Sequence, residues 1–138
     1  MRKIALSLMG CALLSFARPA SAAEPYGVWV RPSTGSQVRF YDCGSKLCAK
    51  VIAVTDQARK GEIGKSIMHG AVKSGENTWK GDLTDAGTGK VYSGTVTLQS
   101  AEALSLQGCI AGFLCQSETW TKGEVAIGYA RPADSPGP

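Results

Sequence analysis

The stretch that decides the fold is VYSGTVTLQS, residues 91–100, in which larger apolar residues alternate with small polar ones. One face of an extended chain here carries Tyr92, Gly94, Val96 and Leu98, and the other carries Ser93, Thr95 and Thr97. Side chains of a β-strand point alternately to its two faces, so this pattern predicts a strand with one face in a core. The next segment repeats the alternation, with Leu104 and Leu106 against Ser105 and Gln107. The two segments predict an antiparallel hairpin.

Similar short segments rich in Val, Thr, Tyr, Trp and Ile recur along the chain between glycine-containing turns. We expect strands near residues 26–31, 37–43, 47–54, 66–72, 77–83, 90–99, 103–110 and 115–122. Most connections are short, which favours antiparallel hairpins, because a parallel crossover needs about a dozen residues. The strands therefore predict an all-β fold, a single up-and-down antiparallel β-barrel of about eight strands, since closure removes the exposed sheet edges. A β-sandwich is the alternative.

Two parts of the chain depart from this strand pattern. The charged segment TDQARKGEIGKS, residues 55–66, is longer than the other connections and predicts a loop with a short helical turn. Beyond Lys122, GEVAIGYA can add a ninth strand, and residues 131–138 predict a disordered tail. The expected barrel domain spans residues 23–130.

The first cysteine pair lies in DCGSKLC, residues 42–48. A two-residue turn at Ser45 and Lys46 would place Cys43 opposite Cys48, Phe40 opposite Val51 and Val38 opposite Ala53. The Cα atoms of a directly opposed, non-hydrogen-bonded pair approach to about 4.5 Å, which a disulfide tolerates. This register predicts a Cys43–Cys48 disulfide.

The second pair lies in CIAGFLC, where a turn centred on Gly112 places Cys109 opposite Cys115 and predicts a second hairpin disulfide. A metal site would need further ligands, yet the chain has one histidine, His69, and neither pair has zinc-finger spacing. A redox motif would need Cys-x-x-Cys at a helix start, which is absent. We therefore expect structural disulfides, no metal and no cofactor.

The N-terminus indicates the compartment. Arg2 and Lys3 precede an apolar run that leads to Ala20-Ser21-Ala22, a small-x-small cleavage site. This pattern predicts a signal peptide over residues 1–22 and a periplasmic or secreted protein, in which cysteines oxidise. A lipoprotein signal ending at Cys11 is the alternative, but too little apolar sequence precedes it.

The charge balance bears on two classes of partner. Residues 1–22 hold three of the fifteen basic side chains and none of the eleven acidic ones, so the remainder carries a net charge of about +1. Binding to a phosphate backbone requires clustered Lys and Arg, so no nucleic-acid partner is expected. The sequence gives no support for membrane-surface binding or for membrane insertion after signal cleavage.

The candidate binding residues lie mainly on the last expected hairpin. In the register set by Cys109 and Cys115, Leu104 opposes Trp120, Leu106 opposes Glu118 and Gly108 opposes Gln116. Polar groups therefore fall on the core face. Either they meet water at the barrel mouth, or a bulge reverses the faces, or Trp120, Glu118 and Gln116 line a lumen with Tyr92 and contact a ligand.

Several segments together carry a family resemblance: GVWV, VRFYDCGSKLCAKVI, KVYSGTVTLQS, LSLQGC and ETWTK, in this order within residues 26–122. They resemble the bacterial exported family catalogued as domain of unknown function 2147, whose members are similar to calycin-type (lipocalin-like) β-barrels and have no agreed activity. In this chain the loop over residues 55–66 is shorter than is usual in the family.

The likeness to calycins implies roles for three further residues. Gly27-Val28-Trp29 is similar to the calycin first-strand Gly-x-Trp, whose indole packs at the closed end of the barrel beneath a basic residue from the last strand. By this resemblance Trp29 is structural, and Lys122 supplies the basic group where family members usually have Arg. The contact would be a cation–π pair.

These observations predict an exported β-barrel that binds a small, partly apolar molecule in its lumen. An envelope structural or protein-interaction domain without catalysis is the first alternative. A hydrolase with an unrecognised site is the second, although the chain has no Gly-x-Ser-x-Gly motif. Dependence of turnover on His69 would favour this alternative. No catalytic residue is assigned, and the sequence specifies neither a ligand nor a protein partner.

Overall fold

A computed structural model of the chain describes residues 24–123. The strands are β1 (Gly27–Val30), β2 (Gln37–Asp42), β3 (Leu47–Ala53), β4 (Ser66–Gly75), β5 (Thr78–Thr84), β6 (Val91–Ser100), β7 (Ala103–Ile110) and β8 (Leu114–Lys122). A 3₁₀-helix, η1 (Gln57–Glu62), lies in the β3–β4 loop, as its charged sequence predicts. The expected signal peptide, the ninth strand past Gly123 and the tail over residues 131–138 lie outside the described residues.

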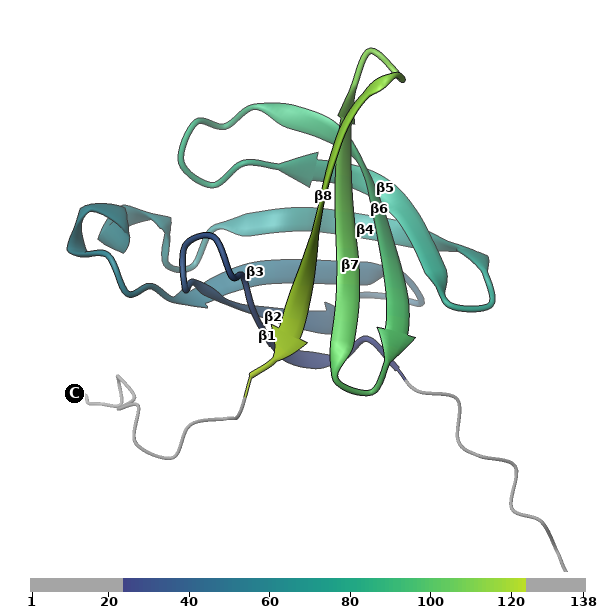
Figure 1. Cartoon of the computed structure of the whole chain (residues 1–138), viewed down its shortest axis with the longest axis horizontal. Helices are drawn as coiled ribbons and strands as arrows, with labels where there is room; N and C mark the ends of the chain where they lie inside the picture. Colours follow the sequence, from purple (N-terminus) through teal and green to yellow (C-terminus); the bar gives the residue numbers. More distant parts are fainter. Residues whose placement is uncertain (1–23, 124–138) are drawn as a thin grey trace, which may run out of the picture.

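The strands form one closed antiparallel barrel in which each strand pairs with its neighbours in sequence (Figure 1). Closure is made by β1 and β8, where Trp29 pairs with Lys122 and Val30 with Thr121. The structure therefore confirms the up-and-down barrel and excludes the sandwich. In the described part of the chain, no helix is long and apolar enough to cross a membrane.

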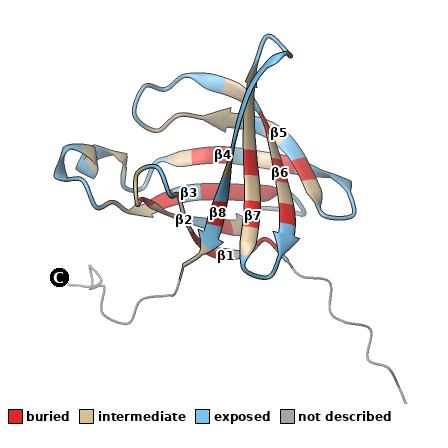
Figure 2. Cartoon of the chain, in the orientation of Figure 1, coloured by how far each residue is buried: buried red, intermediate tan, exposed pale blue. Residues whose placement is uncertain are grey.

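The barrel interior is filled by the apolar face of each strand, as the alternation predicts. On β6, Val96 and Leu98 are buried, and on β7, Leu104 and Leu106 are buried. Buried residues alternate with exposed or half-buried ones along these strands (Figure 2). The core that results also includes Trp29, Phe40, Leu47, Met68 and Trp79.

A row of inward-facing glycines crosses β5, β6 and β7. Gly81 pairs with Gly94, which in turn pairs with Gly108. A Cβ atom on Gly94 would lie 2.8 Å from the Gly81 carbonyl oxygen, and one on Gly81 would lie 2.7 Å from the Cα atom of Ala71. Neither position can hold a larger residue without a backbone shift, so glycine permits the close approach of the strands here.

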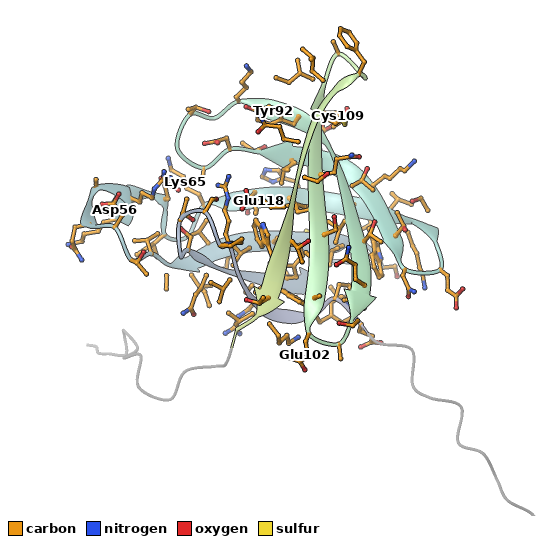
Figure 3. The ribbon with its side chains drawn as sticks, in the orientation of Figure 1. Asp56, Lys65, Tyr92, Glu102, Cys109 and Glu118 are labelled. Carbon is orange, nitrogen blue, oxygen red and sulfur yellow. A yellow bond between two sulfur atoms is a disulfide. The ribbon has the colours of Figure 1, made fainter. Side chains whose placement is uncertain are left out.

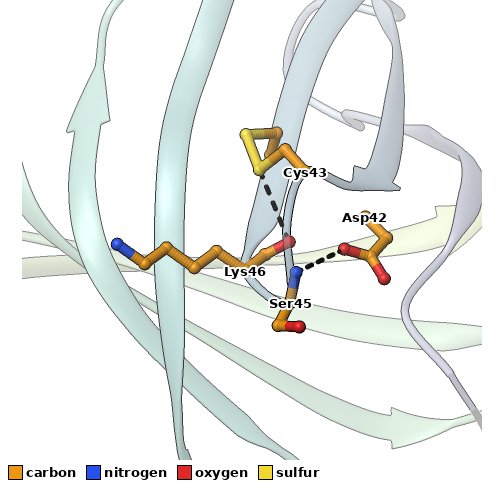
Figure 4. Close-up of a disulfide and its surroundings, with 5 residues drawn as sticks. Asp42, Cys43, Ser45 and Lys46 are labelled. Atoms are coloured by element: carbon orange, nitrogen blue, oxygen red, sulfur yellow. Dashed lines mark hydrogen bonds between the residues drawn. A yellow bond between two sulfur atoms is a disulfide. The ribbon is translucent and has the colours of Figure 1, made fainter.

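The register of the β2–β3 hairpin differs from the one expected. Phe40 pairs with Ala49 rather than Val51, Val38 with Val51 rather than Ala53, and Cys48 with Tyr41 rather than Cys43. Residues 43–46 form the turn, in which the Ser45 amide donates to Asp42 Oδ1 at 2.8 Å (Figure 4). The Cys43–Cys48 disulfide is present, but it joins the turn to β3 across a Cα–Cα distance of 5.8 Å.

The register of the β7–β8 hairpin is as expected. Cys109 pairs with Cys115, Gly108 with Gln116, Leu106 with Glu118 and Leu104 with Trp120, with no bulge between them. The Cys109–Cys115 disulfide joins directly opposed residues, with Cα atoms 4.0 Å apart. The core face of β8 therefore carries Gln116, Glu118 and Trp120.

Candidate functional site

One end of the barrel is open and contains a cavity of about 700 Å³. The loops over residues 31–36, 54–65 and 85–90 surround it, together with the ends of β7 and β8. Apolar side chains from several strands form its inner wall, among them Val38, Val51, Ile67, Leu83 and Leu106. The volume lies within the range of small-molecule sites.

The structure brings together all of the candidate binding residues, because Trp120, Glu118, Gln116 and Tyr92 all line this cavity. Trp120 is 2% exposed, Glu118 is half-buried and Gln116 is exposed, so β8 runs from the core to the mouth. Tyr92 is half-buried on β6. Figure 3 shows Glu118 between the barrel strands and Tyr92 towards the β7–β8 hairpin.

Arg31 is a cavity residue that sequence reasoning missed. Its Nε donates to Glu118 Oε2 at 3.1 Å, which links the segment after β1 to β8. Both side chains are about one-third exposed, so this ion pair contributes under about 1 kcal/mol to stability. Its effect is to orient the Glu118 carboxylate. Arg31 directly follows the end of β1, and only the closure of β1 against β8 brings it near Glu118, so no local sequence signal marked it.

Two polar atoms on the cavity wall have no hydrogen-bond partner among the described residues. They are Glu118 Oε1 and Trp120 Nε1, and both are buried. A buried polar group left without a partner costs about 1–3 kcal/mol. The two residues share one face of β8, with Cα atoms roughly 7 Å apart. The wall therefore presents an acceptor and a donor that a single small molecule can reach.

Trp120 is held rigidly by its neighbours. Its ring meets Phe40 edge-on, with centroids 6.0 Å apart and an interplanar angle of 80°. Edge-to-face contacts of this kind are favourable beyond the apolar area that they bury. The indole N–H is thus fixed in place by packing.

The remaining carboxylates of the cavity already have partners. Glu62 Oε2 accepts from Arg59 Nη1 at 3.2 Å, and Asp85 Oδ1 accepts from the amides of Gly87 at 2.8 Å and Thr88 at 2.9 Å. Partial burial raises the pKa of Asp85, but the hydrogen bonds from Thr88 and Gly87 and the charge of Arg31 outweigh it and lower this pKa below its ordinary value. Glu118 Oε1 is therefore the buried carboxylate oxygen of the described site that is available to a ligand.

Trp29, Gly27 and Lys122 lie away from the cavity. Trp29 is fully buried, and its Nε1 donates to the Pro25 carbonyl at 2.8 Å. Lys122 Nζ lies 4.7 Å from the Trp29 ring centroid and donates to the Tyr26 carbonyl at 2.8 Å. Gly27 has a φ of 120°, and a Cβ atom there would lie 2.6 Å from Lys122 Nζ. The geometry matches a structural role for this group, which stays a prediction.

Two further sequence hypotheses gain no support from the geometry. His69 is exposed on β4 and does not line the cavity, so the hydrolase alternative finds no histidine at this site. Within residues 24–123, no three His, Cys, Asp or Glu side chains lie close enough to hold a metal ion.

The two disulfides are typical of an extracytoplasmic protein.

Comparison with known proteins yields one family and one solved structure. The family described as "Uncharacterized protein conserved in bacteria (DUF2147)" matches residues 27–122. A Helicobacter pylori protein, described as belonging to the lipocalin family, has a similar structure with a TM-score of 0.59 and 19% sequence identity, over 75% of this chain and 85% of that chain. At this identity the likeness shows the fold alone. No curated protein matches the sequence.

Proposed function

The chain belongs to this family of uncharacterised bacterial proteins, DUF2147, and on that premise we propose that it binds a small, partly apolar molecule in the open end of its barrel. The lipocalin-like fold is compatible with such a function, because barrels of this size can hold one small ligand. The proposal itself rests on the cavity of this chain.

The observation that carries the proposal is the pair of unpartnered atoms, Glu118 Oε1 and Trp120 Nε1, in an otherwise largely apolar wall. Ligand sites combine apolar surface with a few convergent polar groups that fix the orientation of the ligand. A core that served only to stabilise the barrel would gain by replacing these two groups with apolar ones, since each costs free energy without a partner.

The pair also limits the chemistry of the ligand. The molecule needs an N–H or O–H that donates to Glu118 and an oxygen or nitrogen that accepts from Trp120. These two residues have Cα atoms roughly 7 Å apart. Its remaining surface is apolar and packs against Leu83, Leu106 and Tyr92. A hydroxy or amino compound with a nearby carbonyl on an apolar body meets these requirements.

The same proposal places the protein in the periplasm or outside the cell. Its support is the pair of disulfides together with the signal-like sequence of residues 1–22. A ligand captured there would come from the envelope or from the medium.

Mass spectrometry of small molecules extracted from the exported, purified protein tests the proposal. We expect a retained compound with the donor, acceptor and apolar body described above, and less of it in Trp120→Phe, which keeps most of the apolar volume but removes the indole N–H. Equal retention by Lys73→Gln, an exposed change on β4, is the matched control. Recovery of no compound from the wild-type protein, or equal recovery from Trp120→Phe, would contradict the proposal.

A further inference from the structure

The tip of the β7–β8 hairpin is apolar and exposed. Phe113 is 75% exposed, Leu114 is 62% exposed and Ile110 is 37% exposed. The sequence contains no charged residue from Gly108 to Ser117. Figure 1 shows this hairpin extending beyond the rest of the barrel, so that no other described segment covers its tip.

The hairpin holds this tip in a fixed shape. Cys109 and Cys115 bond to each other immediately below it, and the turn places Ala111 and Gly112 at φ values of 56° and 80°. A turn of this shape needs glycine or another residue that tolerates a positive φ, but it does not need a large aromatic side chain beside it. Exposing Phe113 to water has an unfavourable free energy, so the residue indicates an apolar contact outside the barrel.

The size of the tip argues against a second protein as that contact. The three side chains expose together roughly 400 Å² at most, whereas a stable interface buries about 800 Å² on each partner. The patch is also narrow and projecting, which suits penetration of a soft surface better than docking of two broad faces. Exposed Phe and Leu side chains bury readily at the boundary between lipid headgroups and acyl chains.

The tip is continuous with the cavity. Ile110 and Leu114 contribute to the exposed tip and also line the cavity mouth. Insertion of the tip into a bilayer would therefore bring the mouth to the lipid surface. An apolar molecule could then pass between the lipid and the cavity with little exposure to water.

We propose that the β7–β8 tip docks the protein on a lipid bilayer through Phe113 and its apolar neighbours. The chain beyond residue 22 is close to electrically neutral, so this attachment depends on apolar insertion and not on charge. Membrane binding has no signature in the charge pattern of the chain, and the exposure of the tip is a property of the fold. The proposal concerns the tip alone and holds whether or not the cavity binds a ligand.

Vesicle co-sedimentation of the exported protein tests this docking. We expect wild-type protein to bind phosphatidylcholine vesicles, with little change on adding salt, and Phe113→Ser to bind about tenfold more weakly because a large apolar side chain no longer enters the lipid. Val72→Ser is the matched control, since Val72 is 55% exposed on β4 and lies outside the tip. It should bind as the wild type does.

A second readout locates the contact directly. In Phe113→Trp the new indole should be quenched by brominated lipid, beyond any quenching of the native tryptophans in the wild type. The proposal is overturned if the wild-type protein does not bind vesicles, if Phe113→Ser binds equally well, or if Phe113→Ser instead breaks a dimer, which would assign the tip to a second copy. Retention of small molecules by Phe113→Ser should be unchanged, and vesicle binding by Trp120→Phe should be unchanged, so the two proposals fail separately.

Discussion

At the residue scale, the two oxygens of the Glu118 carboxylate have different surroundings. Oε2 accepts from Arg31, and Oε1 is buried without a partner. The partly exposed ion pair contributes little to stability, so the free-energy cost of placing an acid on the core face of β8 is offset only if a ligand donates to Oε1.

Glu118→Gln separates the contributions of these two oxygens. It keeps the shape of the side chain and should leave the free energy of unfolding within about 1 kcal/mol of the wild type, because solvent screens the partly exposed pair with Arg31. Affinity for the compound recovered from the protein should fall by about 1.5–3 kcal/mol, the range of a charge-assisted hydrogen bond. Isothermal titration calorimetry measures this change. Glu102→Gln, an exposed change in the β6–β7 turn, is the control and should bind normally; equal affinity of Glu118→Gln would exclude a ligand contact at the carboxylate.

Trp29 is the residue whose loss should damage the fold most. It is fully buried, its indole N–H is satisfied by Pro25, and Lys122 covers its ring. Trp29→Ala removes this packing and should lower the free energy of unfolding by about 3–5 kcal/mol, whereas Trp120→Phe should remain folded. Urea denaturation followed by far-UV circular dichroism measures both. A denaturation midpoint for Trp29→Ala equal to that of the wild type would show that the indole does not support the barrel.

At the element scale, the two hairpins show what a register prediction requires. The β7–β8 register follows correctly from placing Cys109 opposite Cys115. The same assumption fails for β2–β3, because Asp42 accepts from the Ser45 amide and the turn over residues 43–46 takes up Cys43, so that the disulfide connects positions that are not paired. The observed pairs still place Phe40 and Val51 on the same face of the sheet. Both residues are therefore buried in the core although the predicted register was wrong.

Both disulfides should be found in the exported protein. The cysteines lie five positions apart in the first pair and six positions apart in the second. Closing loops this short stabilises the fold by about 2 kcal/mol each in the chain-entropy model. Peptide mapping under non-reducing conditions should yield Cys43 linked to Cys48 and Cys109 linked to Cys115. Replacing either pair by serine should lower the free energy of unfolding by about that amount. A peptide that links the two hairpins to each other would refute this pairing.

At the scale of the whole molecule, strand positions could be predicted from sequence because alternation is a local signal. The face that carries Val96 and Leu98 is visible in ten consecutive residues, and the structure buries that face. The barrel architecture followed from the number of strands and the short connections between them. Trp120, Glu118, Gln116 and Tyr92 could be grouped because three of them alternate along one strand.

Features that depend on long-range pairing could not be predicted. Arg31 reaches Glu118 only because β1 closes against β8, 87 residues later in the chain. The exposure of Phe113 depends on how far the β7–β8 hairpin extends beyond its neighbours. The cavity volume depends on side chains from loops that are distant in sequence. None of these quantities has a local signature, so the polar contacts and the shape of the site required the structure.

The most direct test of the central claim follows the indole N–H signals of Trp29, Trp79 and Trp120 by ¹H–¹⁵N NMR during addition of the compound recovered from the protein. The Trp120 signal should move, because its N–H lacks a protein partner and would donate to the ligand. The Trp29 signal should stay in place, because its N–H already donates to Pro25. A Trp120 signal that does not move at saturating compound would contradict ligand binding in this cavity.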